Sequence, residues 1–249
     1  MQHGEVALVT GASRGLGFEV ARLLGRRRVK LILTARGARD LEAAAGELRR
    51  ETDVLVIDGD VADRGHVERL VGAGMARFGR IDLLVNNAST LGPTPQPSLE
   101  ALPPDALDHV FRVNAAAPLH FMQLVLPGMR TRAHGTIVNV SSDAAVEAYP
   151  GWGGYSASKA ALEHLSRVLG AELAGSGVRL YIVDPGDMNT QMHRDADPGA
   201  DASLLPGPDV AAASLVELLE RETAPFGRFE LRSWSGRDAR SAAEPSAVS

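Results

Sequence analysis

The sequence predicts an α/β fold, a doubly wound parallel sheet of about seven strands with helices on both faces. Three observations lead to this fold class. Short apolar runs alternate with longer helical patterns through almost the whole chain. Most of these runs are apolar throughout, which is typical of strands that are buried on both faces. A glycine-rich turn joins the first predicted strand to the first predicted helix.

The predicted elements follow one another in a regular order, which favours parallel strands joined by crossover helices. We expect strands at residues 6–10, 30–34, 54–58, 81–87, 135–142, 178–184 and 227–233. We expect helices at residues 15–27, 38–50, 64–78, 104–130, 155–174 and 208–221. No repeat or linker divides the chain, so residues 1–234 are expected to form one domain. Residues 235–249 are small and polar and are expected to form a mobile C-terminal tail.

The composition excludes several classes of protein. The 249 residues carry a net charge of −5, which provides no basic surface for nucleic acid. The chain has no cysteine, so disulfides, thiol catalysis and cysteine-bound metals are excluded. Neither a signal peptide nor an apolar run long enough to span a bilayer is visible. We therefore expect a cytoplasmic protein that does not contact membranes.

Two long segments, 89–104 and 186–209, interrupt the alternation of strands and helices. Each follows the carboxyl end of a predicted strand, and open α/β sheets bind their ligands at that edge. Five of the 14 prolines lie in the first segment. We therefore expect residues 92–97, 143–154 and 187–205 to line a ligand pocket.

The turn after the first strand, TGASRGLG, places Gly11, Gly15 and Gly17 at a strand-to-helix junction. Glycines allow a tight turn and a close approach of the backbone to a pyrophosphate, which the helix N-terminus also attracts. The spacing is G-x-x-x-G-x-G rather than the common dinucleotide fingerprint. The turn by itself is compatible both with nucleotide binding and with an ordinary glycine-rich turn.

Two alternatives use the same stretches of sequence. GASRG also matches the G-x-S-x-G of serine hydrolases, with Ser13 as the nucleophile. Such an elbow after the first strand would lack an oxyanion loop from an earlier strand, and it would leave Tyr155 and Lys159 unexplained. Ser156 and Lys159 match S-x-x-K, but neither S-D-N nor K-T-G is present. Nucleotide binding is the favoured interpretation.

The end of the second predicted strand predicts which dinucleotide is bound. It reads Thr34, Ala35, Arg36, with no carboxylate before Asp40. An acidic residue there binds the free ribose hydroxyl of NAD, whereas an arginine accommodates the 2′-phosphate of NADP. Arg14 in the glycine turn is a second cation, so the sequence favours NADP(H) over NAD(H).

Seven motifs, in order along the chain, resemble those of the compact, single-domain short-chain dehydrogenases/reductases with a Tyr-x-x-x-Lys pair. They are TGASRGLG (10–17), GDV (59–61), NNAS (86–89), VN (113–114), VNVSS (138–142), YSASK (155–159) and DPGDMNT (184–190). The resemblance covers nearly the whole chain and implies a Rossmann-type fold. It departs from the family pattern at Ser89, which replaces a glycine. A serine would be strained there if the backbone needed a positive φ.

The resemblance implies an oxidoreductase that interconverts a carbonyl and an alcohol, with Asn114, Ser142, Tyr155 and Lys159 as catalytic residues. In the family, Tyr155 exchanges a proton with the substrate oxygen, Ser142 binds that oxygen, and Asn114 supports Lys159 through a water. Ser141 is the neighbouring alternative to Ser142. A free phenol has a pKa of about 10. We expect the ammonium of Lys159, one helical turn away, to lower the pKa of Tyr155.

The resemblance also implies which residues contact a nicotinamide cofactor. Asp60 would contact the adenine, Lys159 the nicotinamide ribose, and Thr190 the carboxamide. The predicted set is Gly11, Ser13, Arg14, Gly15, Leu16, Gly17, Arg36, Asp60, Val61, Asn87, Ala88, Tyr155, Lys159, Pro185, Gly186 and Thr190.

The expected pocket lining is rich in proline, glycine and methionine, and it includes Tyr149 and Trp152. This composition favours a small or apolar carbonyl or alcohol as substrate. Met188, Met192 and His193 lie on the segment expected to cover it, although His193 is equally compatible with an ordinary loop. The seven histidines are scattered, so we expect no metal in the chemistry.

Two further expectations concern assembly and class. The resemblance implies a homodimer or homotetramer that associates through helices 104–130 and 155–174. The alternative is a protein of a different functional class with the same fold, namely a nucleotide-binding regulatory or structural protein with little turnover. Such members commonly lose the tyrosine or the lysine, whereas this chain keeps both Tyr155 and Lys159.

Overall fold

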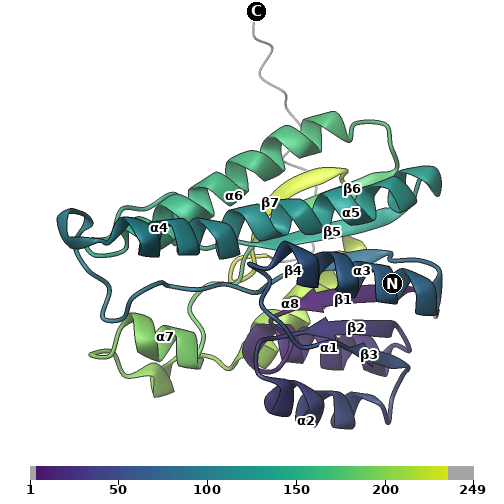
Figure 1. The fold of residues 1–249 in the computed structure, drawn as a ribbon, viewed down its shortest axis with the longest axis horizontal. Helices are drawn as coiled ribbons and strands as arrows, with labels where there is room; N and C mark the ends of the chain where they lie inside the picture. The colour runs from purple at the N-terminus through teal and green to yellow at the C-terminus, as the bar shows by residue number, and fades with distance from the viewer. Residues whose placement is uncertain (1–3, 235–249) are drawn as a thin grey trace, which may run out of the picture.

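Seven parallel strands form one sheet in the computed structural model, which describes residues 4–234 (Figure 1). They are β1 (Val6–Thr10), β2 (Lys30–Thr34), β3 (Val54–Val56), β4 (Leu83–Asn86), β5 (Gly135–Val140), β6 (Val178–Asp184) and β7 (Phe226–Glu230). Their order in the sheet is β3-β2-β1-β4-β5-β6-β7. The order reverses between β1 and β4, which creates a crevice at the carboxyl ends of these strands. The predicted doubly wound α/β fold is confirmed.

Helices cover both faces of the sheet. One face carries α1 (Gly15–Arg26), α2 (Ala38–Leu48) and α8 (Pro208–Arg221). The other carries α3 (Arg64–Phe78), α5 (Ala117–Thr131) and α6 (Gly153–Glu172). The shorter elements are η1 (Leu99–Ala101), α4 (Pro104–Phe111), η2 (Arg112–Ala116), η3 (Asp143–Ala145), α7 (Gln191–Ala196) and η4 (Ala202–Leu204). No helix within residues 4–234 is long and apolar enough to cross a membrane.

The strands bury apolar side chains on both faces, as their uniformly apolar sequences predict. Along β1, Ala7 and Val9 join the core under α1 and α8, whereas Val6 and Leu8 join the core under α3 and α5. Each fully buried large aliphatic side chain stabilises the fold by roughly 1.5–3 kcal/mol. The two cores together hold the sheet rigid between its helical layers.

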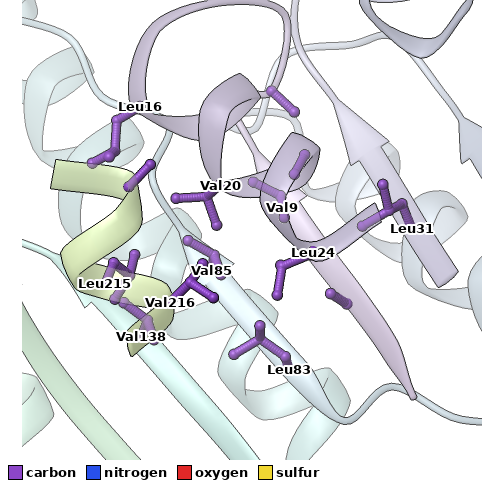
Figure 2. Packing of buried hydrophobic residues seen from close by; sticks show 14 of the residues in the cluster. Val9, Leu16, Val20, Leu24, Leu31, Leu83, Val85, Val138, Leu215 and Val216 are labelled. Atoms are coloured by element: carbon purple, nitrogen blue, oxygen red, sulfur yellow. The ribbon is translucent and has the colours of Figure 1, made fainter. Parts of the chain in front are cut away.

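Helix α1 shows how the apolar period places a helix over the crevice. Leu16, Val20 and Leu24 recur every fourth position and are all buried, so they form one stripe along the helix. Figure 2 shows this stripe beside Leu215 and Val216 of α8, above the strands. The stripe fixes the direction of α1, and its N-terminus therefore lies at the carboxyl edge of β1.

The structure divides the helix predicted at residues 104–130. Helix α4 ends at Phe111, the π-helical turn η2 follows, and α5 begins at Ala117. Asn114 in this turn is fully buried, and its side chain bonds both the N–H and the carbonyl oxygen of Thr90. Turns of this kind are inserted into helices and are frequent at functional sites. An extra residue in the turn reorients the helix so that the amide of Asn114 reaches the loop after β4.

Helix α7 and strand β7 also differ from prediction, and several other elements begin or end a few residues from their predicted bounds. Helix α7 was not expected, because six residues are too few to show a helical period. Strand β7 ends at Glu230 rather than at residue 233, since Ser233 and Trp234 donate their N–H groups back to the carbonyl oxygen of Glu230 in a turn. The tail predicted at residues 235–249 lies outside the described residues.

A buried carboxylate joins the amino ends of β1 and β4. Asp82 is 2% exposed. It accepts a hydrogen bond from the backbone N–H of Val6 at 3.0 Å and one from Nε of Arg80 at 2.7 Å. Nη2 of Arg132, at the end of α5, lies 3.4 Å from it. The carboxylate therefore connects two strands and one helix at the edge opposite the crevice.

We expect Asp82→Ala to lower the free energy of unfolding by about 3 kcal/mol, because it leaves the N–H of Val6 without its partner and removes the counter-charge of Arg80 and Arg132. Urea denaturation measures this loss. Glu47→Ala, which removes an exposed carboxylate from α2, is the matched control and should change stability by less than about 0.5 kcal/mol. Equal stability of the two variants would contradict the role given to Asp82.

Candidate active site

A cavity of about 830 Å³ opens at the carboxyl edge of the sheet. The segments that follow β1 to β6 all contribute to its wall. All of the predicted cofactor residues except Gly17 line it. Ser142, Tyr155 and Lys159 line it too, whereas Asn114 lies buried behind the wall. The structure thus brings the sequence-predicted residues together in one place, although their roles stay predictions.

Glycine is required in the first turn for two different structural reasons. Gly11 and Gly15 adopt φ angles of +66° and +60°, which side chains with a Cβ rarely tolerate. Gly17 is required by space, since a Cβ there would lie 2.5 Å from the carbonyl oxygen of Gly11 and 2.5 Å from Nδ2 of Asn87. This close packing explains why Gly17 supports the turn from behind instead of lining the cavity.

Thr10 and Asn87 link the ends of β1 and β4 beneath this turn. The N–H groups of Asn87 and Ala88 both donate to Oγ1 of Thr10 at 3.0 Å. In return, Nδ2 of Asn87 donates to the carbonyl oxygens of Thr10 at 2.9 Å and Gly11 at 3.2 Å. The predicted cofactor residue Asn87 is therefore also a brace for the glycine turn.

The glycine end of the cavity suits an anion. Helix α1 begins here, and its N-cap residue Arg14 makes no side-chain capping bond, so backbone N–H groups are available to a phosphate. Arg14 and Arg36 are exposed, line the cavity and form no ion pair within the described residues. Asp40 lines the same end, so an acidic group follows the two cations within the first turn of α2.

The loop after β3 is held by a histidine that the sequence did not single out. His66 is 1% exposed, and its Nε2 lies 2.9 Å from Oγ1 of Thr34 at the end of β2. It packs so closely on Gly59 that a Cβ there would lie 2.2 Å from Nδ1. Asp60 follows, and its carboxylate accepts the N–H of Ala62 at 2.9 Å. His66 thus sets the position of the predicted adenine contact.

Tyr155 stands at the other end of the cavity, near the start of α6. It is 7% exposed, and the hydroxyls of Ser142 and Ser89 act on its phenol. Burial raises the pKa of Tyr155 to about 12 against the opposing effect of these two hydroxyls, and the charges of Asp184 and Asp143 act in the same direction as burial. The protein alone therefore holds the phenol in its protonated form.

Lys159 lies one turn further along α6 and is 2% exposed. Its Nζ donates to the carbonyl oxygen of Val140 at 2.8 Å and lies 5.6 Å from the centre of the Tyr155 ring. Burial lowers the pKa of Lys159 to about 8, and the charge of Glu163 opposes this. The expected lowering of the Tyr155 pKa by Lys159 is not found in the protein alone, because burial of the phenol dominates.

The two candidate serines have different surroundings. Ser142 is partly exposed, lines the cavity and acts on the phenol of Tyr155. Ser141 is 3% exposed and donates its proton to Oε1 of Glu163 at 2.8 Å. Glu163 also accepts from Nε of Arg228, on β7, at 3.0 Å. The geometry therefore favours Ser142 as the serine that faces a substrate.

The amide of Asn114 is fully used by direct contacts. Its Nδ2 donates to Ser158 at 2.9 Å and to the carbonyl oxygen of Thr90 at 2.8 Å. Its Oδ1 accepts from the N–H of Thr90 at 2.9 Å and from the hydroxyl of Ser89 at 3.1 Å. The predicted water-mediated link to Lys159 stays a prediction. Ser89 does not have a positive φ, so the strain considered for this serine does not arise.

Helix α7 covers part of the cavity, within the segment expected to lie over the substrate. Thr190 caps it, since its Oγ1 accepts the N–H of His193 at 3.3 Å. At its other end Ala196 packs against the cluster that contains Tyr155. Nδ1 of His193 lies 3.9 Å from a carboxylate oxygen of Asp187. Thr190 therefore has a structural role as a cap in addition to its predicted cofactor contact.

The hydrolase alternatives gain no support from this geometry. Ser13 lines the glycine end and makes no hydrogen bond to a histidine within residues 4–234. The hydroxyl of Ser156 is buried without a partner, so it does not bond Lys159. Among the described residues, no three histidine, aspartate or glutamate side chains are grouped closely enough to hold a metal ion.

Comparisons with known proteins agree with this site. The family model of the short chain dehydrogenases matches residues 5–201, and the chain therefore belongs to this family. It is an oxidoreductase of the kind that acts on alcohol or carbonyl groups. It is 39% identical over 191 residues to 2-(R)-hydroxypropyl-CoM dehydrogenase of Xanthobacter autotrophicus, which covers 75% of this chain and 76% of that protein.

Two solved structures share the whole architecture. An alcohol dehydrogenase from the archaeon Thermococcus sibiricus, complexed with 5-hydroxy-NADP, is 29% identical with a TM-score of 0.81. That match covers 91% of this chain and 95% of the other. A metagenomic short-chain oxidoreductase in complex with NADP is 29% identical, with a TM-score of 0.77 and coverage of 92% and 98%.

The buried ammonium of Lys159 should lower stability at neutral pH. Its pKa falls from 10.5 to about 8 on folding, so the unfolded chain binds more protons between these values. The resulting cost, roughly 3 kcal/mol at pH 7, should disappear as the pH rises from 8 to 10.5. We expect Lys159→Met to be more stable than the wild type at pH 7 by about 2 kcal/mol, because the loss of the hydrogen bond to Val140 offsets part of the gain.

Urea denaturation at pH 7, 8.5 and 10 tests this prediction, and the gain of Lys159→Met should shrink across the series. Lys30, the only other lysine in the chain, provides the control. Lys30→Met should show no comparable gain at pH 7, because Lys30 is only partly buried. A gain for Lys159→Met that does not change with pH would rule out the assigned cost.

Proposed function

We propose that the protein is an NADP(H)-preferring oxidoreductase that interconverts a carbonyl and an alcohol, with Tyr155 as general acid and base. One observation carries this proposal. A single cavity holds the buried pair Tyr155 and Lys159 at one end and a glycine cradle with Arg14 and Arg36 at the other. A cavity with two such ends suits an extended ligand with a reactive group and a phosphate group.

A nicotinamide cofactor fits the chemistry of the residues present. Gly11, Gly15 and the N-terminus of α1 would hold the pyrophosphate. Arg14 and Arg36 would bind the 2′-phosphate through charge-assisted hydrogen bonds. When bound, the cofactor supplies or accepts the hydride. The NADP and 5-hydroxy-NADP complexes of the two solved neighbours support the choice of NADP.

Tyr155 would transfer the proton. Its raised pKa keeps the phenol protonated at neutral pH, so the resting site is prepared to donate a proton to a carbonyl oxygen. In the direction of oxidation, the phenolate would take a proton from the alcohol. The ammonium of Lys159, 5.6 Å from the ring, is the cation placed to stabilise that phenolate.

Ser142 and Asn114 would orient the reaction. Ser142 would bind the substrate oxygen beside Tyr155. Asn114 would position the site, because its four hydrogen bonds hold the loop after β4 against α6. The removal of either side chain should reduce turnover without removing the proton donor.

The substrate is proposed to be a small or apolar carbonyl compound, or the corresponding alcohol. Leu91, Trp152 and Met192 provide apolar wall near Tyr155. The Xanthobacter relative, by its name, acts on a hydroxypropyl group, which supports an alcohol on a short chain. A panel of small aldehydes, ketones and alcohols, tested with NADPH, NADH and their oxidised forms, should identify a substrate.

The same panel tests the regulatory alternative, since tight NADPH binding without any turnover would indicate a regulator. A homodimer or homotetramer through the helices of residues 104–130 and 155–174, and a cytoplasmic location, remain part of the proposal.

We expect Tyr155→Phe to reduce turnover of a verified substrate by about 10²–10⁴-fold, because the proton donor is lost. Thermal unfolding and NADPH affinity should stay near the wild-type values, since only one hydroxyl is removed. Lys159→Ala is the contrasting variant, and it should weaken NADPH binding as well as turnover. Near-normal turnover of Tyr155→Phe would show that another group transfers the proton.

We expect Arg14→Ala combined with Arg36→Asp to reverse the preference for NADPH over NADH. A charge-assisted bond to phosphate contributes roughly 1.5–3 kcal/mol, so the wild-type preference should be about tenfold or more. The ratio of kcat/KM for the two cofactors measures it. Arg39→Ala is the control, since Arg39 is an exposed neighbour in α2 that does not line the cavity. An unchanged ratio in the double variant would refute the assignment of these arginines.

A further inference from the structure

Residues 142–155 form a circuit of contacts beside the phenol of Tyr155. Ser142, which acts on that phenol, donates its own proton to Oδ1 of Asp143 at 2.8 Å. The hydroxyl of Tyr149 donates to Oδ2 of Asp143 at 2.9 Å. The rings of Tyr149 and Trp152, and those of Trp152 and Tyr155, are each 5.8 Å apart. Asp143 is the residue on which the polar half of this circuit converges.

The hydrogen bonds of the circuit have a fixed direction. An ionised carboxylate only accepts, and a serine hydroxyl has a single proton to give. The N–H of Ala144 donates to Oδ1 of Asp143 at 2.8 Å and also approaches Oγ of Ser142 at 3.2 Å. Ser142 therefore gives its proton to Asp143 while it lines the cavity together with Tyr155.

The second hydroxyl beside the phenol is committed in the same way. Ser89 donates its proton to Oδ1 of Asn114 at 3.1 Å. A hydroxyl stabilises a phenolate only when it donates to it. Both hydroxyls lower the pKa of Tyr155, so the acceptors that take their protons, Asp143 and Asn114, limit how far they can stabilise a phenolate.

We propose that Asp143 is a positioning residue of the active site, which competes with Tyr155 and the substrate oxygen for the one proton of Ser142. This inference rests on the proposed function, in which Tyr155 exchanges a proton with the substrate. Asp143 holds Ser142 as an acceptor, favours the phenol over the phenolate, and so suits the site to proton donation. Loss of the carboxylate frees the proton of Ser142 to stabilise the phenolate that alcohol oxidation requires.

Other charges face the circuit from the elements packed around it. Lys159 of α6 lies 5.6 Å from the Tyr155 ring, and Asp184 at the end of β6 also acts on Tyr155. Arg232, which follows β7, acts on Asp143. Glu147 and Asp187 act on Tyr149. All five charges are kept in the variants below, so a change in the pH profile can be assigned to the carboxylate that is removed.

The test is the pH dependence of kcat/KM for alcohol oxidation, measured with saturating NADP⁺ and the alcohol that the substrate panel identifies. In Asp143→Ala and Asp143→Asn, the apparent pKa of the rising limb should fall by about one pH unit. Asp143→Asn keeps an oxygen for the N–H of Ala144, so it preserves the turn if Asp143→Ala loosens it. Tyr149→Phe is the matched control. It removes one bond to Asp143, leaves the carboxylate, and should keep the wild-type profile.

A second comparison separates an effect of Asp143 that acts through Ser142 from a direct effect of its charge on Tyr155. The shift caused by Asp143→Ala is measured again in a Ser142→Ala background, at enzyme concentrations that compensate for its lower rate. If Asp143 acts through Ser142, the shift should be no more than about half as large. An equal shift in both backgrounds, or unchanged profiles for both Asp143 variants, would overturn the inference while the proposed function stands. Absence of wild-type turnover with the whole panel would instead refute the proposed function, and this inference with it.

Discussion

The pairing of Thr10 with Asn87 is the constraint on which the site depends. Strands β1 and β4 are parallel neighbours, but the chain after β1 leads to β2 on one side and the chain after β4 leads to β5 on the other, and this divergence opens the crevice. Reciprocal bonds between the two residues hold the ends of both strands together, with Nδ2 of Asn87 also fixing Gly11. Without this brace, the glycine turn and the loop after β4 would have no fixed relation, and neither end of the cavity would be defined relative to the other.

The polar interior of the site explains why so much hydrogen bonding surrounds it. Asn114 and Lys159 are buried, and each would be costly without partners. Asn114 meets this requirement with four bonds, whereas Lys159 has the carbonyl oxygen of Val140 and the nearby charge of Glu163. The site therefore gives up stability at one residue for chemistry, which is the usual trade between stability and activity. The surrounding apolar cores compensate for that loss.

Much of the fold and the membership of the site could be predicted from sequence, because apolar runs, glycine spacing and short motifs are local features. The partners of buried groups could not be predicted from sequence. Spacing placed Lys159 one turn from Tyr155, but it did not reveal that burial would raise the pKa of the phenol. Asp143 and His66 gave no signal, because their importance lies in contacts with Ser142 and Thr34 that only the folded chain creates. The π-helical turn at Asn114 was hidden inside an unbroken helical pattern for the same reason.

The position of Arg228 on the last strand has a consequence for how the chain is made. Glu163 and Asp184 are buried carboxylates beside the site, and Arg228 lies 3.0 Å from the first and 3.7 Å from the second. A ribosome delivers this arginine only after the six other strands of the described sheet, because β7 follows them all in the sequence. Until then Asp184 lacks this counter-charge and Glu163 has only Arg167, at 3.0 Å, so burying the two acids is less favourable. The nascent protein thus completes its catalytic half after its glycine half.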